Sequence, residues 1–238
     1  MSATNFRIHL LNDGIIKLDG GALFGQVPKV FWESLMKPDK RNRIRLNLNC
    51  LLIQPPDGNV LVDTGAGSKS KDDMKELYGL NGSTLRKELR DVGASPTDID
   101  YVIPTDLHFH HAGGGTRINR RGEAVPTFPR AKYLIQEAAW KEANHPNERT
   151  QSFFHRDDFL PLEKQGQIEL LQGDQEVIPG VTIKAVSGPS RGHQMVLIHY
   201  SGHRVAFLGD LVPTPYHLAL SYISAYDQFP EESLTSKR

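Results

Sequence analysis

The sequence predicts one α/β domain in which two β-sheets lie in contact and helices cover them. The order of elements is the main observation: β-rich hairpins come first, helices and strands alternate next, and β-rich sequence returns at the end. The length of 238 residues suits one layered domain with a full core. Hydrophobic residues make up 38% and charged residues 24%, which is typical of a soluble globular protein. We therefore treat residues 1–238 as a single domain.

The first part of the chain is rich in strand signals. Residues 6–20 read as strand, turn and strand, with "NDG" as the turn. Residues 46–63 predict a hairpin, because "LNLNCLLIQ" and "VLVDTG" flank the turn sequence "PPDGN". Residues 21–45 form an irregular excursion, whose aromatic side chains either close an edge of the core or belong to a loop that covers a site. These aromatics are Phe24, Phe31 and Trp32.

Helices then alternate with strands. Residues 69–93 predict two helices that each end at a glycine, and Ser95 is a candidate cap for the short turn that follows. "YVIP" and "AKYLIQ" predict strands, and "EAAWKEANH" predicts a helix. Residues 147–165 read as irregular to helical, and short strands recur from residue 167 onward.

Composition excludes several classes of partner. Lys plus Arg and Asp plus Glu both number 28, so nothing favours nucleic acid or an acidic membrane surface. No window approaches the roughly 20 apolar residues of a membrane span, and the N-terminus lacks the pattern of a signal peptide. The single cysteine, Cys50, lies in an apolar run and is expected to be buried. We expect a cytoplasmic protein that acts on a small molecule, and homodimer formation is left open.

The stretch "IPTDLHFHHAGGG" concentrates possible metal ligands. Asp106, His108 and His110 alternate, and His111 follows directly. Alternate residues of a strand share one face, and adjacent residues also converge where a strand opens into a loop. Imidazole nitrogen and carboxylate oxygen are ligands for zinc, iron and manganese. A polar loop with surface histidines rarely gathers three histidines and a carboxylate so closely, so we expect a metal site. The glycines that follow let the backbone pass close to metal or substrate.

Three further polar residues occupy the ends of predicted strands. His193 precedes "QMVLI", Asp210 follows "VAFLG", and Asp63 follows "VLV". Each signal is weak alone, but ligands of α/β proteins gather at strand ends. We expect these residues to join the histidine motif in one cluster.

With these motifs in order, the sequence resembles the metallo-β-lactamase-fold hydrolases. "LVDTG", "PTDLHFHHAGG", "GHQMVLI" and "FLGDLVP" carry the resemblance over most of the chain, and the match is best with the branch of quorum-quenching lactonases and methyl-parathion-hydrolase-like enzymes. The resemblance implies a four-layer αββα sandwich with a dinuclear metal site between the sheets. It implies support for the site from Asp63. It places the metal ligands at Asp106, His108, His110, His111, His193 and Asp210.

The motif departs from the family pattern. The family has H-x-H-x-D-H, whereas this chain has D-x-H-x-H-H, so Asp106 and His110 have exchanged residue types. By resemblance, Asp106, His108 and His193 would hold one metal ion. His110 and His111 would hold the other, and Asp210 would bridge the two. The family aspartate at position 110 also accepts a hydrogen bond from the attacking hydroxide. We expect metal binding to survive the exchange better than the catalytic rate.

The family also provides a further histidine ligand from a segment beyond the "YDQFP" region, and this chain stops soon afterwards, at Arg238. We therefore expect the domain to lack the family's C-terminal segment. His110 would then serve as an extra imidazole for the second metal. His217 is another candidate ligand, although a position in the surroundings of the site is favoured for it.

The resemblance implies a metal-dependent hydrolase. Metal-bound hydroxide would attack a lactone or small ester, with phosphotriesters as promiscuous substrates, and His110 and Asp210 would be the catalytic residues. Two divalent metal ions are expected, with zinc favoured over iron or manganese. One alternative is a metal-binding relative with little or no activity. Another is an iron-dependent oxidoreductase of the same fold, because two imidazoles and a carboxylate suit mononuclear iron.

Overall fold

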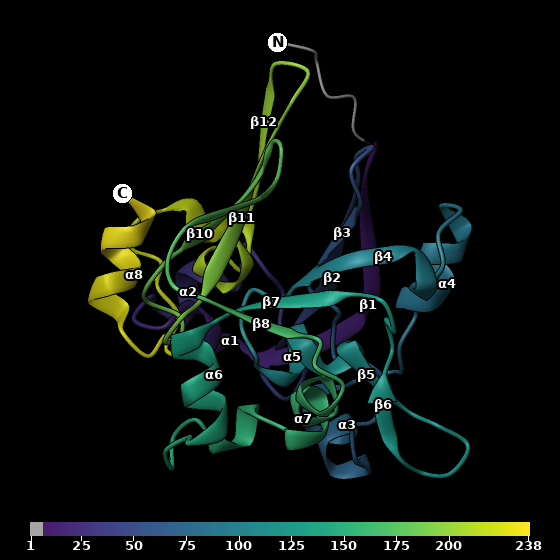
Figure 1. Ribbon diagram of the computed structural model, residues 1–238. Coiled ribbons are helices and arrows are strands. Elements are labelled where there is room, and N and C mark those ends of the chain that lie inside the picture. Colours follow the sequence, from purple (N-terminus) through teal and green to yellow (C-terminus); the bar gives the residue numbers. More distant parts are fainter. Residues whose placement is uncertain (1–6) are drawn as a thin grey trace.

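Two facing β-sheets form the centre of the protein in a computed structural model that describes residues 7–238 (Figure 1). The larger sheet has six strands in the order β1-β2-β3-β4-β7-β8 and the smaller has four in the order β12-β11-β10-β9. The strands of the larger sheet are β1 Arg7–Asp19, β2 Arg43–Gln54, β3 Asn59–Val62, β4 Ile99–Ile103, β7 Lys132–Gln136 and β8 Ile168–Leu171. Those of the smaller sheet are β9 Gln175–Ile178, β10 Val181–Ala185, β11 Gln194–Tyr200 and β12 His203–Phe207. A separate hairpin pairs β5 Thr116–Ile118 with β6 Ala124–Pro126.

Short helices lie outside the sheets. The α-helices are α1 Gly20–Phe24, α2 Lys29–Trp32, α3 Asp72–Tyr78, α4 Leu85–Asp91, α5 Phe109–Ala112, α6 Glu137–Asn144, α7 Arg156–Lys164 and α8 Pro230–Lys237. Tighter helical turns are η1 Pro96–Asp98, η2 Gly113–Gly115, η3 Gln151–Phe153, η4 Gly209–Leu211 and η5 Pro215–Leu218. Within residues 7–238, no helix is long and apolar enough to cross a membrane.

The two faces of the larger sheet pack against different layers. In β2 and β3, Ile53 and Val62 join Ile183 and Val196 of the smaller sheet in one buried cluster. The alternate residues point the other way, and Leu52 and others pack against α4, α6 and α7. This alternation follows from the two-residue period of a strand. The helix–sheet–sheet arrangement confirms the predicted layers, and Cys50 is buried as expected.

The predicted hairpin in residues 6–20 is wrong. Residues 7–19 form the single long strand β1, which pairs with β2 along nearly its whole length. The sequence "NDG" produces a bulge, because the register shifts between Asn12 and Ile15, where Gly14 takes a φ of +139°. A glycine accepts this backbone conformation without strain, so the strand bends and continues.

The excursion between β1 and β2 folds into α1 and α2. Phe24 and Trp32 stack with ring centroids 5.4 Å apart and are fully buried. These two aromatics therefore close an edge of the core. Phe31 points outward and is 61% exposed.

Strand order places the candidate residues at one end of the sheets. Strands β3 and β4 run parallel, so Asp63 and the segment that begins at Pro104 leave the sheet at the same edge. His193 immediately precedes β11, and Asp210 lies in η4, just after β12. The expectation that these residues sit at strand ends is confirmed.

Candidate metal centre

The histidine motif forms a single turn of helix. His108 caps α5 in an extended conformation, and the backbone N–H of His111 donates to its carbonyl over 2.9 Å. The ring centroids of His110 and His111 are consequently 4.1 Å apart. A helical turn, rather than alternation along a strand, therefore brings these two side chains together.

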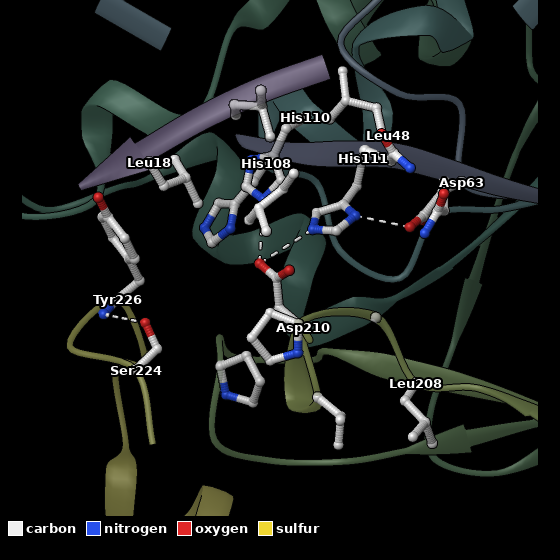
Figure 2. A pocket seen from close by; sticks show the side chains of 18 of the residues that line it. Leu18, Leu48, Asp63, His108, His110, His111, Leu208, Asp210, Ser224 and Tyr226 are labelled. Carbon is white, nitrogen blue, oxygen red and sulfur yellow. Dashed lines mark hydrogen bonds and ion pairs between the residues drawn. The ribbon is translucent and has the colours of Figure 1, made fainter. Parts of the chain in front are cut away.

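Five of the six predicted ligands form two groups suited to a cation. One group is His108, His110 and Asp210, and the other is Asp106, His111 and Asp210. In each group the nearest ligand atoms lie within 4.8 Å of one another. Asp210 belongs to both groups and faces the three histidines (Figure 2). A carboxylate shared in this way is a candidate ligand for a cation in either group.

His193 belongs to neither group. Its Nε2 accepts a hydrogen bond from the backbone N–H of Asp210 over 3.2 Å, and its side chain is fully buried. The structure thus places His193 beside the cluster. The division of the ligands between two metal ions that the resemblance implies stays a prediction.

Asp63 orients His111. One carboxylate oxygen of Asp63 lies 2.7 Å from His111 Nδ1 and also accepts from the Thr105 hydroxyl over 3.0 Å. The other oxygen accepts from the backbone N–H of Thr105 over 2.6 Å. A carboxylate at Nδ1 favours the tautomer with hydrogen there, which leaves Nε2 free as a ligand. His111 Nε2 lies 3.2 Å from Asp210 Oδ2. Asp63 thus contacts a candidate ligand, and its supporting role at a metal site stays a prediction.

Asp106 lies against His108. Its Oδ2 is 2.9 Å from His108 Nδ1 and accepts from the Ser190 hydroxyl over 3.1 Å. Its Oδ1 accepts from the backbone N–H of His108 over 2.8 Å. The exchanged partner, His110, places Nε2 3.2 Å from Asp210 Oδ2. Both exchanged side chains therefore remain part of the cluster.

Several buried nitrogens of the cluster lack hydrogen-bond partners among the described residues. They are Nε2 of His108, Nδ1 of His110 and Nδ1 of His193. A buried polar atom without a partner destabilises a fold unless a ligand satisfies it. Neutral imidazoles and ionised carboxylates are the donor set of zinc and similar divalent metals. The residues present therefore fit a metal ion.

The electrostatic interactions within the cluster also favour a bound cation. Burial opposes ionisation of Asp210, yet the pKa of its carboxyl lies well below the ordinary value because His111 and His110 lie against it. Burial would lower the pKa of His111, but Asp63, Asp210 and Asp106 raise it well above the ordinary value. Burial lowers the pKa of His110 and of His193. The carboxylates thus stabilise positive charge at the centre of the cluster.

Two glycines after the motif allow a close approach of backbone segments. A Cβ at Gly113 would lie 2.4 Å from the carbonyl oxygen of Ala66, and one at Gly114 would lie 2.0 Å from that of Thr64. Both distances are too short for real contacts. The glycines therefore let the loop after Asp63 pack against the histidine motif, and Thr64 N–H donates to His111 O over 2.7 Å.

A cavity of about 340 Å³ opens beside the cluster (Figure 2). His108, His110, His111 and Asp210 line one part of it. Most of the remaining wall is apolar and comes from β1, β2 and the segment after β12. Its apolar residues include Leu18, Leu46, Leu48, Phe153, Leu208 and Val212.

The sequence did not reveal every residue that shapes the site. Ser190 and Thr105 hold carboxylates of the cluster, but a lone hydroxyl carries no motif. Lys69 is buried and pairs with Asp158 over 3.0 Å, and its amino group also donates to the carbonyls of Gly113 and Thr116. Lys69 closely follows the glycine-rich sequence "DTGAG", a signal that could have suggested its contact with the glycines after His111.

His217 stands away from the cluster. Its Nδ1 bonds to the Thr214 hydroxyl over 2.7 Å, and its Nε2 donates to the carbonyl of Leu23 over 2.9 Å. Both ring nitrogens are thus engaged with protein atoms. This matches the surrounding role that the sequence favoured.

Comparison with known proteins assigns the family. The model of the metallo-β-lactamase superfamily matches residues 43–237. The chain therefore belongs to the metallo-β-lactamase superfamily, and the αββα fold predicted from the sequence is confirmed. A crystal structure of a probable metal-dependent hydrolase from Staphylococcus aureus is 32% identical, with a TM-score of 0.91, and the match covers 100% of this chain and 84% of that one.

The similar curated proteins include lactonases. An N-acyl homoserine lactonase of Bacillus cereus is 30% identical over 168 residues, which cover 66% of this chain and 60% of the relative. A crystal structure of a quorum-quenching N-acyl homoserine lactone lactonase is 25% identical, with a TM-score of 0.75, and the match covers 100% of this chain and 85% of that one. The matched part of the chain spans about 60% of the length of the curated lactonase.

Proposed function

We propose that this protein is a metal-dependent hydrolase that opens a lactone or small ester. One observation supports the proposal most strongly: a buried cluster of histidines and carboxylates, with Asp210 shared by both groups, lines a cavity whose other walls are mostly apolar. Such a cavity suits a substrate with a reactive carbonyl at one end and a hydrocarbon part at the other. The similarity to N-acyl homoserine lactonases supports this substrate class.

The proposed centre holds two divalent metal ions, and zinc suits its imidazole-rich donor set. The ligand residues in this proposal are Asp106, His108, His110, His111, His193 and Asp210. Divalent ions supply two kinds of chemistry when bound: they lower the pKa of water and they polarise a carbonyl oxygen.

The protein side chains fix the geometry in which this chemistry takes place. Asp63 keeps the hydrogen of His111 on Nδ1, so Nε2 faces the centre. Asp210 Oδ2 lies 3.2 Å from a ring nitrogen of both His110 and His111, which holds the shared carboxylate between the two groups. The apolar walls exclude water from the substrate's hydrocarbon part and strengthen electrostatic interactions at the carbonyl.

The exchange at positions 106 and 110 bears on the rate. A neutral imidazole that ligates a metal is a poorer proton acceptor than a carboxylate, and His110 stands where the family has aspartate. We therefore propose a slower hydrolase than relatives with the family motif. A metal-binding relative without turnover is the second candidate, and the same observation favours it.

Metal analysis coupled to activity assays tests the proposal. Protein purified without added metal is analysed for zinc, iron and manganese, and is then assayed with N-acyl homoserine lactones, an aryl ester and a phosphotriester. Lactone opening that disappears on chelation and returns with added zinc supports the proposal. Full metal occupancy without turnover on any substrate selects the second candidate. Iron with oxygen uptake on a thiol substrate instead indicates an oxidoreductase.

A further inference from the structure

A second pocket lies on a different part of the molecule. It has a volume of about 570 Å³ and lies between α4 and the hairpin strand β5. Backbone at Gly67 and Gly114 belongs to its lining, together with the side chains of both elements. It shares no lining residue with the cavity at the metal centre. The two pockets are therefore distinct.

Cationic residues from two elements line this pocket. Arg86 and Arg90 are one helical turn apart on α4, Lys87 lies between them, and Arg117 reaches the pocket from β5. Residues four apart on a helix share a face. The positive charge of the pocket therefore comes from both of its sides.

Few of these charges are neutralised by the protein. Lys87 pairs with Asp91 over 3.0 Å. Within residues 7–238, none of Arg86, Arg90 and Arg117 forms an ion pair. Glu88 and Asp91 also lie on α4, where Asp91 pairs with Lys87. Asp98 accepts two hydrogen bonds from Ser95. Three guanidinium groups are thus left for an anion from outside.

A buried hydroxyl adds an uncharged donor. Thr127 lines the pocket and is only 7% exposed, and within the described part of the chain its Oγ1 has no hydrogen-bond partner. Its backbone N–H is engaged with the carbonyl of Gly115. A buried hydroxyl without a partner is costly unless a ligand or water satisfies it. This residue gives the pocket a feature that a merely solvated basic surface lacks.

We propose that the pocket between α4 and β5 binds a small molecule that bears a phosphate or sulfate group. A guanidinium group presents a planar fork of N–H donors that matches such oxyanions. A tetrahedral oxyanion offers several oxygens, and in this proposal they accept from arginines of α4 and β5 and from the hydroxyl of Thr127, all of which belong to residues that line the pocket. The pocket is larger than the anion alone, which leaves room for the remainder of the molecule. The proposal does not depend on the hydrolase activity.

Calorimetric titration with inorganic phosphate and with sulfate at low ionic strength tests the proposal. We expect both anions to bind the unmodified protein and the affinity to fall as salt is added. Arg90→Gln combined with Arg117→Gln is expected to weaken binding by at least about tenfold, because each arginine contributes a charge-assisted hydrogen bond. Thr127→Val should also weaken it. The matched control is Arg45→Gln combined with Arg204→Gln, which removes two exposed arginines elsewhere and should leave the affinity unchanged.

The metal centre is the main competing location for an anion, so each titration is repeated after chelation of metal. Binding that survives chelation and is lost in the Arg90/Arg117 variant supports the pocket. Binding that survives in this variant but disappears on chelation assigns the anion to the metal centre and overturns the proposal. Absence of phosphate and sulfate binding at millimolar concentrations overturns it as well.

Discussion

The substitution Asp63→Asn tests how the metal centre is held. Asp63 is 2% exposed, and its two oxygens accept from Thr105 N–H, from the Thr105 hydroxyl and from His111 Nδ1. If the asparagine oxygen keeps the bond to Thr105 N–H, its amino group faces His111 Nδ1. His111 must then accept at Nδ1 and carry its hydrogen on Nε2, where a metal would bind. If the amide is flipped, its amino group faces the backbone N–H of Thr105, so two hydrogen-bond donors oppose each other.

The expected loss follows from that geometry. A hydrogen bond to a charged group contributes roughly 1.5–3 kcal/mol. Loss of a residue that orients a metal-binding histidine lowers metal affinity by about 10–100-fold. We expect a loss of this size in zinc affinity, measured by competition with a chromogenic chelator. Imidazole ¹⁵N NMR of the metal-free protein, at a pH high enough to deprotonate the His111 ring, whose pKa is raised, should show its remaining hydrogen moving from Nδ1 to Nε2.

Asp100→Asn is the matched control. Asp100 lies near the start of β4 and accepts from the backbone N–H of Asn59 over 2.8 Å, at the opposite end of this strand from the segment that carries the histidine motif. This variant removes an equivalent charge, but it should retain zinc affinity and the His111 tautomer. Unaltered zinc affinity in a folded Asp63→Asn protein would refute the orienting role of Asp63.

Three further predictions concern the exchange, a buried ion pair and a buried acid. Asp106→His combined with His110→Asp restores the family order of ligands, so lactone opening should become faster while metal content is retained. Steady-state kinetics and elemental analysis check this. An unchanged rate would show that the exchange of residue types does not affect catalysis. Lys69→Met leaves Asp158 buried without its cation and should lower the free energy of unfolding by about 3–5 kcal/mol. Lys69→Met combined with Asp158→Leu should lower it less, because no unpaired charge is then buried. Urea unfolding measures both variants, and equal losses of stability would contradict the pairing. Burial raises the pKa of Asp13 from 3.8 to about 6, although Ser83, Gly67 and Leu85 donate to its carboxylate. The stabilising contribution of protonated Asp13 is therefore present below pH 3.8 and is lost as the pH rises through about 6. The free energy of unfolding of the unmodified protein, relative to Asp13→Asn, should fall by up to about 3 kcal/mol over that range. Unfolding measured at several pH values checks this.

Local patterns in the sequence were sufficient for the layers and for the cluster. Two apolar runs around the turn sequence "PPDGN" predicted β2 and β3, and polar residues directly after apolar runs predicted the positions of Asp63 and Asp210. These signals work because a strand's period and its end are local properties of the chain. The residue types in the motif from Asp106 to His111 were sufficient to predict a metal site.

Other features depend on contacts that are distant in sequence. The "NDG" signal in residues 6–20 read as a turn, but β2 is long enough to pair with both halves, so the chain bulges and continues. The contact of Ser190 with Asp106 joins residues 84 positions apart, and no local pattern announces it. Likewise, the sequence left open whether Phe24 and Trp32 cover a site or close the core. The fold places both among buried residues.

Metal content provides the most direct test of the account. In the proposed function, Asp106, His108, His110, His111, His193 and Asp210 form one metal centre. Elemental analysis of protein purified without added metal, and again after zinc is supplied and the excess removed, should find about two divalent ions per chain. Asp210→Ala, which removes the residue shared by both groups, should sharply lower that content while the fold persists. Protein that remains metal-free after zinc is supplied, or an Asp210→Ala variant with full metal content, would contradict the account.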